Sequence, residues 1–122
     1  MSDTIIINSI TTLKSFVVDL KKNIFRPKTG SFLFLFRSIQ RYMELVEIHC
    51  KICSSHIGKN DQTDQYLMII TREIGDIRKM IFNHSEVNDK FRETEEDIHD
   101  CFDQIEMNIE YLESMFTPEV AQ

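Results

Sequence analysis

The chain has 122 residues, of which 42% are hydrophobic and 28% are charged, and its formal net charge is −6. This balance is typical of one globular domain, residues 1–122, and excludes wholesale disorder, while no apolar run reaches the ~20 residues that span a membrane. The odd number of cysteines, three, favours reduced thiols over a disulfide framework, and the N-terminus lacks the pattern of a signal peptide, so we expect a soluble cytoplasmic protein.

The positions of apolar and helix-breaking residues predict four helices, over residues 9–25, 32–57, 64–82 and 86–116. The first helix carries apolar residues at steps of three and four. It ends before Pro27, because the residue ahead of a proline avoids the helical region. The isoleucines at positions 5–7 precede this helix. A strand there would have no evident partner, so we expect a helix lead-in or a packed tail.

The second predicted helix opens with an apolar run at residues 32–36, which we expect to be buried on several sides or to meet a partner. Gly58 follows this helix in the position of a C′ residue. A polar loop over residues 58–63 leads to the third helix. Its inward side is expected to carry Leu67, Ile70, Ile74, Ile77 and Ile81.

The fourth predicted helix is amphipathic over its whole length. Its apolar rows are Phe91, Ile98, Ile105 and Leu112, and Phe102, Ile109 and Phe116. Spacings of four and seven residues place both rows on one side of a helix. The opposite side is acidic, and its carboxylates are the candidate partner-binding residues: Glu93, Glu96, Asp100, Asp103, Glu106, Glu110 and Glu113.

These elements predict an all-α fold, a four-helix antiparallel bundle with a long acidic C-terminal helix. At about 1.5 Å per residue this helix would be about 46 Å long, which exceeds the diameter of a compact domain of this size. It must therefore bend, break near its polar opening at residues 88–97, or project beyond its neighbours. A projecting end with heptad-like spacing would suit a homodimer formed through this helix.

The charges divide the chain into a basic and an acidic half. Residues 1–60 hold nine Lys and Arg against four Asp and Glu, whereas residues 61–122 hold five against sixteen. This acidic half argues against nucleic acid as a partner, since nucleic-acid binding depends on neutralising phosphates. Between Glu93 and Glu113 no Lys or Arg relieves the repulsion. Compensation must come from a basic partner or from cations of the first two helices, which are Lys14, Lys21, Lys22, Arg37 and Arg41.

Thiols and imidazoles cluster between His49 and His56, where Cys50 and Cys53 also lie. Zinc prefers these ligands, and His49, Cys53 and His56 share a helix face. Cys101 of the fourth helix could approach the same face. A structural zinc site usually presents its Cys-x-x-Cys pair on a turn, however, whereas this pair lies within a predicted helix. We therefore interpret the cysteines as small core residues and expect no metal and no cofactor.

Arg78 and His84 form a second candidate pair. The segment between them resembles the Arg-x(4–6)-His motif of the HEPN superfamily, small all-helical domains that include ribonucleases. The resemblance covers seven residues, and Lys79 stands where the family usually has a polar residue such as Asn or Asp. It implies that Arg78 and His84 line a dimer cleft and act on an RNA phosphodiester. The alternative is a solvated arginine and a histidine near a helix C-terminus, where a cation is favourable.

The sequence has no readable Ser/His/Asp arrangement and no glycine-rich phosphate loop, so we expect no enzymatic activity. The acidic stripe favours a protein-binding function. In this hypothesis the helix engages a basic partner and neutralises or chaperones it, as immunity proteins, antitoxins and secretion chaperones do. Neither nucleic acid nor a membrane is expected as a partner. The alternatives are a HEPN-like ribonuclease that uses Arg78 and His84, and a structural helical subunit of a larger assembly.

Overall fold

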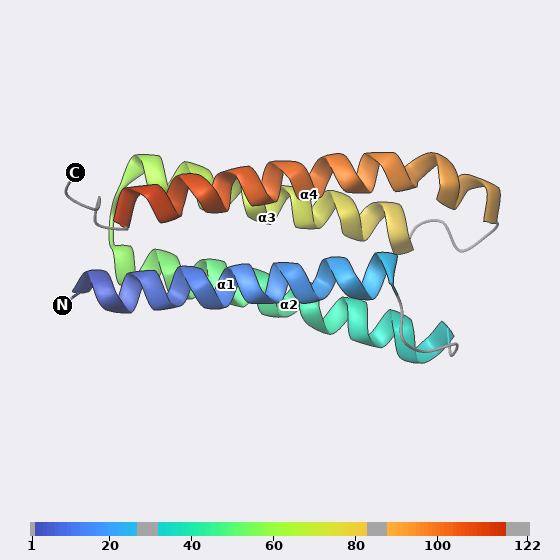
Figure 1. The fold of residues 1–122 in the computed structure, drawn as a ribbon, viewed down its shortest axis with the longest axis horizontal. Helices are drawn as coiled ribbons and strands as arrows, with labels where there is room; N and C mark the ends of the chain where they lie inside the picture. The colour runs from blue at the N-terminus through green and yellow to red at the C-terminus, as the bar shows by residue number, and fades with distance from the viewer. Residues whose placement is uncertain (1, 27–31, 83–87, 117–122) are drawn as a thin grey trace.

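The computed structural model describes residues 2–26, 32–82 and 88–116, without the side chains of residues 2, 3, 32 and 88–94. Its elements are all helices: α1 (Ser2–Phe25), α2 (Phe32–Ile57), α3 (Asp61–Phe82) and α4 (Asn88–Phe116) (Figure 1). Within the described ranges there is no strand. The prediction of an all-α fold with four helices is therefore confirmed.

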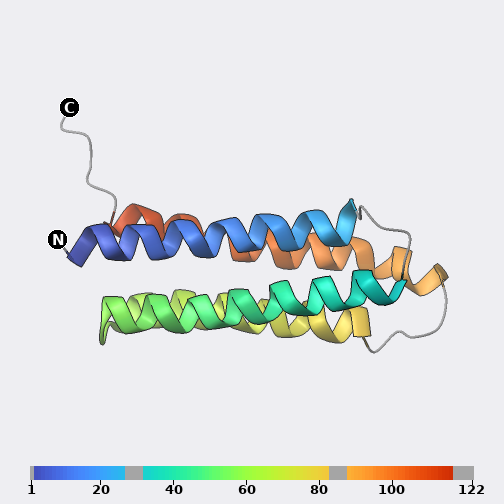
Figure 2. The same cartoon turned by 90° about the horizontal axis from the view of Figure 1, so that it is seen from below.

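The four helices lie side by side as a bundle (Figures 1 and 2). Each helix packs against two others, so that the contacting pairs are α1 with α2, α2 with α3, α3 with α4 and α4 with α1. Among the described residues, α2 makes no contact with α4 and α1 makes none with α3. Consequently α2 and α4 occupy diagonally opposite corners, and their outer sides face away from each other.

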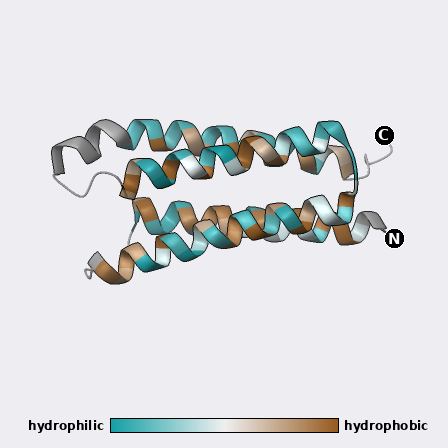
Figure 3. Cartoon of the chain, turned by 180° about the vertical axis from the view of Figure 1, so that it is seen from behind, coloured by the Kyte–Doolittle hydropathy of each residue, from teal (hydrophilic) through white to brown (hydrophobic). Residues whose placement is uncertain are grey.

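The core lies along the axis of the bundle because each helix repeats an apolar residue every three or four positions. Burying one such side chain stabilises the fold by roughly 1.5–3 kcal/mol. The largest side chains with no more than 1% exposure come from all four helices: Ile10, Leu13, Leu20, Met43, Ile70, Ile74, Ile77, Ile98, Phe102, Ile105, Ile109 and Leu112. Figure 3 shows the resulting mixture of hydrophobic and hydrophilic turns along the helices.

Two helices begin earlier than the sequence patterns predicted. Helix α1 begins at Ser2 instead of residue 9, because Ile6 lies four positions before Ile10 and is buried on the same side. The isoleucines at 5–7 are thus part of the helix, neither a strand nor a tail. Helix α3 begins at Asp61 instead of residue 64. Helix α4 begins at Asn88 instead of residue 86, and the expected cap before it lies outside the described residues.

Asn60 explains the early start of α3. Its side-chain Oδ1 accepts hydrogen bonds from the backbone N–H groups of Gln62 (3.0 Å) and Thr63 (3.1 Å). The N–H of Asp64 donates to the backbone oxygen of Asn60 at 2.9 Å, which is the first helical bond. This is the geometry of an N-cap, which satisfies donors that the first helical turn leaves without partners.

We expect Asn60→Ala to lower the free energy of unfolding by about 1 kcal/mol, because it removes this cap. The measurement is urea-induced unfolding followed by circular dichroism. Gln65→Ala is the matched control, because Gln65 is exposed within the same helix and its substitution should change stability far less. Equal losses in the two variants would contradict the role assigned to Asn60.

Gly58 ends α2 as predicted. Its φ angle is +81°, in the left-handed region that glycine adopts without a steric penalty, and its N–H donates to the Ser54 backbone oxygen at 2.9 Å. The apolar run that opens α2 was expected either to be buried on several sides or to meet a partner. Leu33 is 62% exposed in this chain, so burial on several sides is wrong for this residue, and contact with a partner stays a prediction.

Helix α4 has 29 residues, which at about 1.5 Å per residue makes it about 44 Å long. Its N-terminal turns extend beyond the ends of α1 and α3 (Figures 1 and 2). Of the three outcomes that its length allowed, which were bending, breaking and projection beyond its neighbours, the structure shows projection. Among the described helices, none combines the length and the apolar composition that crossing a membrane requires.

Candidate interaction surface

The orientation of α4 follows from its buried row. Ile98, Ile105 and Leu112 are fully buried, and they repeat every seven residues on the side that faces the bundle. The carboxylates between them must therefore lie elsewhere on the helix. The structure divides these carboxylates into two groups, which differ in their partners.

The first group faces α1. Lys21 Nζ lies 2.7 Å from Glu106 Oε1, and Lys14 Nζ lies 3.2 Å from Glu113 Oε1. The four side chains are between 33% and 51% exposed, so each ion pair is worth only about 0.2–1 kcal/mol. The sequence had offered five cations of the first two helices for this role. Two of them, both on α1, fulfil it.

The other three do not. Lys22 lies on α1 but forms no ion pair within the described residues. Arg37 and Arg41 belong to α2, which does not contact α4. The suggestion that they compensate the acidic helix is wrong for a single chain, because the helix that carries them lies at the opposite corner of the bundle.

The second group faces solvent. Glu96, Asp100, Asp103 and Glu110 are exposed, and within the described part of the chain none of them has an ion-pair partner. Glu110 lies at the edge of this group, because it also lines a groove between α1 and α4. We call these four residues the outward acidic face of α4. Repulsion between neighbours at spacings of three and four residues costs a few tenths of a kcal/mol per pair. The side chain of Glu93, the remaining candidate, lies outside the described residues.

An exposed apolar row runs beside the outward acidic face. Met107, Tyr111 and Met115 are 40%, 44% and 38% exposed, and their spacing of four residues places them along one line of α4. The Tyr111 ring lies 5.3 Å from the Tyr66 ring of α3, centroid to centroid. This row was not predicted from the sequence, although its spacing of i, i+4 and i+8 within the acidic side of the helix was a readable signal.

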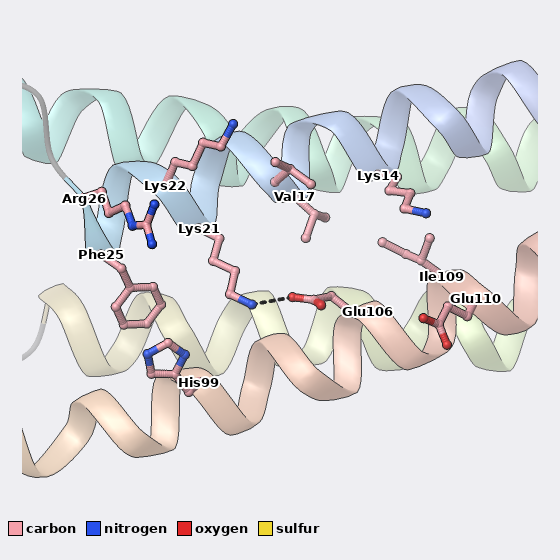
Figure 4. Close-up of a pocket in the computed structure, with 11 residues that line it drawn as sticks. Lys14, Val17, Lys21, Lys22, Phe25, Arg26, His99, Glu106, Ile109 and Glu110 are labelled. Carbon is pink, nitrogen blue, oxygen red and sulfur yellow. Dashed lines mark hydrogen bonds and ion pairs between the residues drawn. The ribbon is translucent and has the colours of Figure 1, made fainter.

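A groove of about 440 Å³ lies where α1 meets α4 (Figure 4). At one end the Phe25 ring stacks on the His99 ring, with centroids 3.9 Å apart and planes 10° apart. Further along, the Lys21–Glu106 ion pair crosses the groove, and Lys21 Nζ also lies 5.9 Å from the centre of the Phe102 ring. Cations of α1 face Glu106 and Glu110 of α4 here, so the groove is mixed in charge, and only Glu110 of the outward acidic face lines it.

The three cysteines are buried, which confirms their interpretation as core residues. His49 Nδ1 lies 2.9 Å from the Leu45 backbone oxygen, and His56 is exposed to solvent. Among the described residues, no three His, Cys, Asp or Glu side chains are grouped so that they could hold a metal ion. Cys101 does not approach this cluster, as the zinc interpretation would have required, since α4 does not contact α2.

Burial makes all three thiols weak acids. It raises the pKa of Cys50 to about 12 and that of Cys53 to about 11. Burial also raises the pKa of Cys101 to about 12, and the hydrogen bond and charge of Glu73 act in the same direction. Because the folded-state pKa values lie above the ordinary value of 9.0, the thiols favour folding below pH 9. This contribution is lost as the pH rises towards 11 and 12.

We expect alkylation by iodoacetamide at pH 8 to be about 100-fold slower, or more, in the native protein than in denaturant, because the reactive thiolate is scarce. Mass spectrometry of samples quenched at intervals measures the rate at each cysteine. Native rates equal to those in denaturant would contradict the burial of the thiols.

Arg78 is bound within the fold. Its guanidinium donates to the Glu47 carboxylate twice, with Nη1–Oε2 and Nη2–Oε1 distances of 3.3 and 2.5 Å, and this hydrogen bonding raises the pKa of Arg78. The pair joins α3 to α2. His84 lies outside the described residues, so the pairing that the HEPN resemblance implies is not tested.

Comparisons with protein-family models, with curated proteins and with solved structures find no match to this chain.

Proposed function

We propose that the protein is a non-enzymatic protein-binding module that engages a basic surface of a partner through the outward acidic face of α4. The proposal assumes an antiparallel bundle with a long acidic C-terminal helix. The alternating course of the helices in Figures 1 and 2 supports this arrangement.

The single observation that carries the proposal is the division of the α4 carboxylates. Lysines of α1 neutralise Glu106 and Glu113, whereas the outward acidic face has no ion-pair partner among the described residues. Four exposed carboxylates with no cation between them create a negative potential that attracts a basic surface. Binding such a surface would relieve the repulsion that the free protein retains.

The apolar row of Met107, Tyr111 and Met115 supports the same proposal. Tyrosine and methionine are enriched where proteins bind one another, and methionine adapts its shape to different partners. Charge would then accelerate association, while the apolar row would contribute to the lifetime of the complex. A basic toxin that must be neutralised, or a basic cargo that must be chaperoned, in the cytoplasm has the required chemistry.

The test is capture of binding proteins from the native cell extract by the immobilised protein. The wild type is compared with the neutralised variant Glu96→Gln/Asp100→Asn/Asp103→Asn. A matched control, Ser15→Lys/Ser55→Lys/Gln65→Lys, changes the net charge by the same amount at exposed positions of α1, α2 and α3. We expect basic proteins that high salt releases to bind the wild type and the control but not the neutralised variant. Equal capture by the neutralised variant would contradict the proposal.

A further inference from the structure

The outer side of α2 combines basic and apolar side chains. Arg37, Arg41, Ile48 and Ile52 follow one another at spacings of four, seven and four residues, which places them on one side of the helix. Ile48 and Ile52 are 49% and 36% exposed. Neither arginine has an ion-pair partner among the described residues. We call these four residues the basic–apolar face of α2.

This face is hollowed. A groove of about 520 Å³ runs along it and reaches Phe82 of α3. Its lining on α2 includes both arginines, Leu45 and Ile48, and one carboxylate, Glu44. Two arginines outnumber the one carboxylate of this groove, so its net charge is positive, and Ile48 adds an exposed apolar side chain. A groove that combines charge with exposed apolar groups is typical of a protein-binding surface. The chemistry of an occupant follows: it must present carboxylates and apolar groups in the same order.

Helix α4 presents that order. Glu96, Asp100, Met107 and Tyr111 repeat the spacing of four, seven and four residues, with carboxylates where α2 has arginines and apolar side chains where α2 has isoleucines. All four are exposed. If α4 lay parallel to α2, each carboxylate would meet a guanidinium and each apolar residue would meet an isoleucine.

The two faces cannot meet within one molecule, because α2 and α4 occupy diagonal corners of the bundle and do not contact each other. They can meet between two molecules. The N-terminal ends of both helices lie at the same end of the bundle (Figures 1 and 2), so a neighbouring copy in the same orientation would present its α4 parallel to α2.

We propose that the protein associates with itself head to tail, the α4 face of one copy on the basic–apolar face of α2 in the next. This inference rests on the proposed function, since it names a second copy as one occupant of the same α4 surface. The two faces lie on opposite sides of each molecule. A pair of molecules therefore keeps one unoccupied face at each end, and further copies can add to form an open chain. A basic partner would compete for α4 and shorten the chain.

The test measures the mean mass by sedimentation over a range of protein concentrations at low salt. The mean mass of the wild type is expected to rise with protein concentration beyond the mass of a dimer. At high salt it should return to the mass of a monomer. Arg37→Glu/Arg41→Glu and Glu96→Lys/Asp100→Lys should each raise the dissociation constant about tenfold or more. The matched control Lys59→Glu/Arg72→Glu makes the same charge change as the arginine variant at exposed positions and should associate like wild type.

Charge exchange gives the sharpest result. A chain that carries all four substitutions again has opposite charges on its two faces and should recover association. In an equimolar mixture of the two double variants, one variant has two acidic faces and the other has two basic faces, so the two should associate in alternation. Circular dichroism of each variant shows whether the helices are retained. A wild type that stays monomeric, one that stops at a dimer, a control as weak as the arginine variant, or no recovery in the four-fold variant would overturn the proposal.

These outcomes are distinct from a failure of the proposed function. A monomeric wild type that still captures basic proteins through Glu96, Asp100 and Asp103 would remove the self-association and leave partner binding intact. Capture of an acidic protein that depends on Arg37 and Arg41 would assign the α2 face to a different occupant and would also overturn self-association.

Discussion

Phe102→Ala is expected to lower the free energy of unfolding by about 3–5 kcal/mol, the largest loss of stability from a single substitution considered for this chain. The Phe102 side chain is fully buried in the bundle, and the Phe25 ring meets it edge-on with centroids 6.1 Å apart. Truncation removes buried apolar surface and leaves a cavity that rigid helices fill only in part. Since natural domains unfold at a cost of about 5–15 kcal/mol, this is a large share of the total.

Chemical denaturation followed by circular dichroism measures this loss. Met68→Ala is the control, because Met68 is 67% exposed on α3 and its removal creates no cavity. Its effect should stay within about 0.5 kcal/mol. Comparable losses in the two variants would mean that α4 does not bury Phe102 in the core.

Replacing Glu96, Asp100 and Asp103 with lysine is expected to slow association with a basic partner by about 10- to 10³-fold at low ionic strength, with little change in the fold. The reversal converts attraction into repulsion on approach, and rim charges act mainly on the association rate. Stopped-flow or surface-based kinetics with the captured partner measures the rate constant. Because the three side chains are exposed, the thermal unfolding midpoint should stay close to that of the wild type.

A control for this reversal is Glu106→Lys, at a carboxylate of the same helix that faces Lys21 of α1, and its effect is compared per unit of charge change because it replaces one carboxylate instead of three. A single reversal there removes an ion pair of the fold and should change the association rate much less than reversal on the outward side. If all these substitutions slowed association in proportion to net charge alone, the binding surface would not be specific to the outward side of α4.

Much of the fold was predictable because burial follows helical periodicity. The apolar steps of three and four gave the four helices, and the residues so identified in α3 are all buried. Gly58 was recognisable because few residues other than glycine adopt positive φ at the end of a helix. The cysteines were recognisable as core residues because they continue the apolar stripe of α2 and α4.

The remaining features depend on which helices are neighbours, and periodicity carries no such information. The sequence offered lysines and arginines from two helices as partners for the acidic stripe, but α1 is the neighbour of α4 and α2 is not. The pairing of Arg78 with Glu47 joins positions 31 residues apart and was equally hidden. Helix starts were missed for local reasons, since a single cap such as Asn60 outweighs weak helix propensities around it.

The central claim is that the outward acidic face of α4 is a binding surface, and carboxylate footprinting tests it most directly. Carbodiimide-activated labelling of the free protein and of its complex with the captured partner, followed by peptide mass spectrometry, gives the reactivity of each carboxylate. The account predicts protection of Glu96, Asp100, Asp103 and Glu110 in the complex, with Asp61 and Asp64 at the start of α3 unchanged. Full reactivity of the four α4 carboxylates in a stable complex would contradict it.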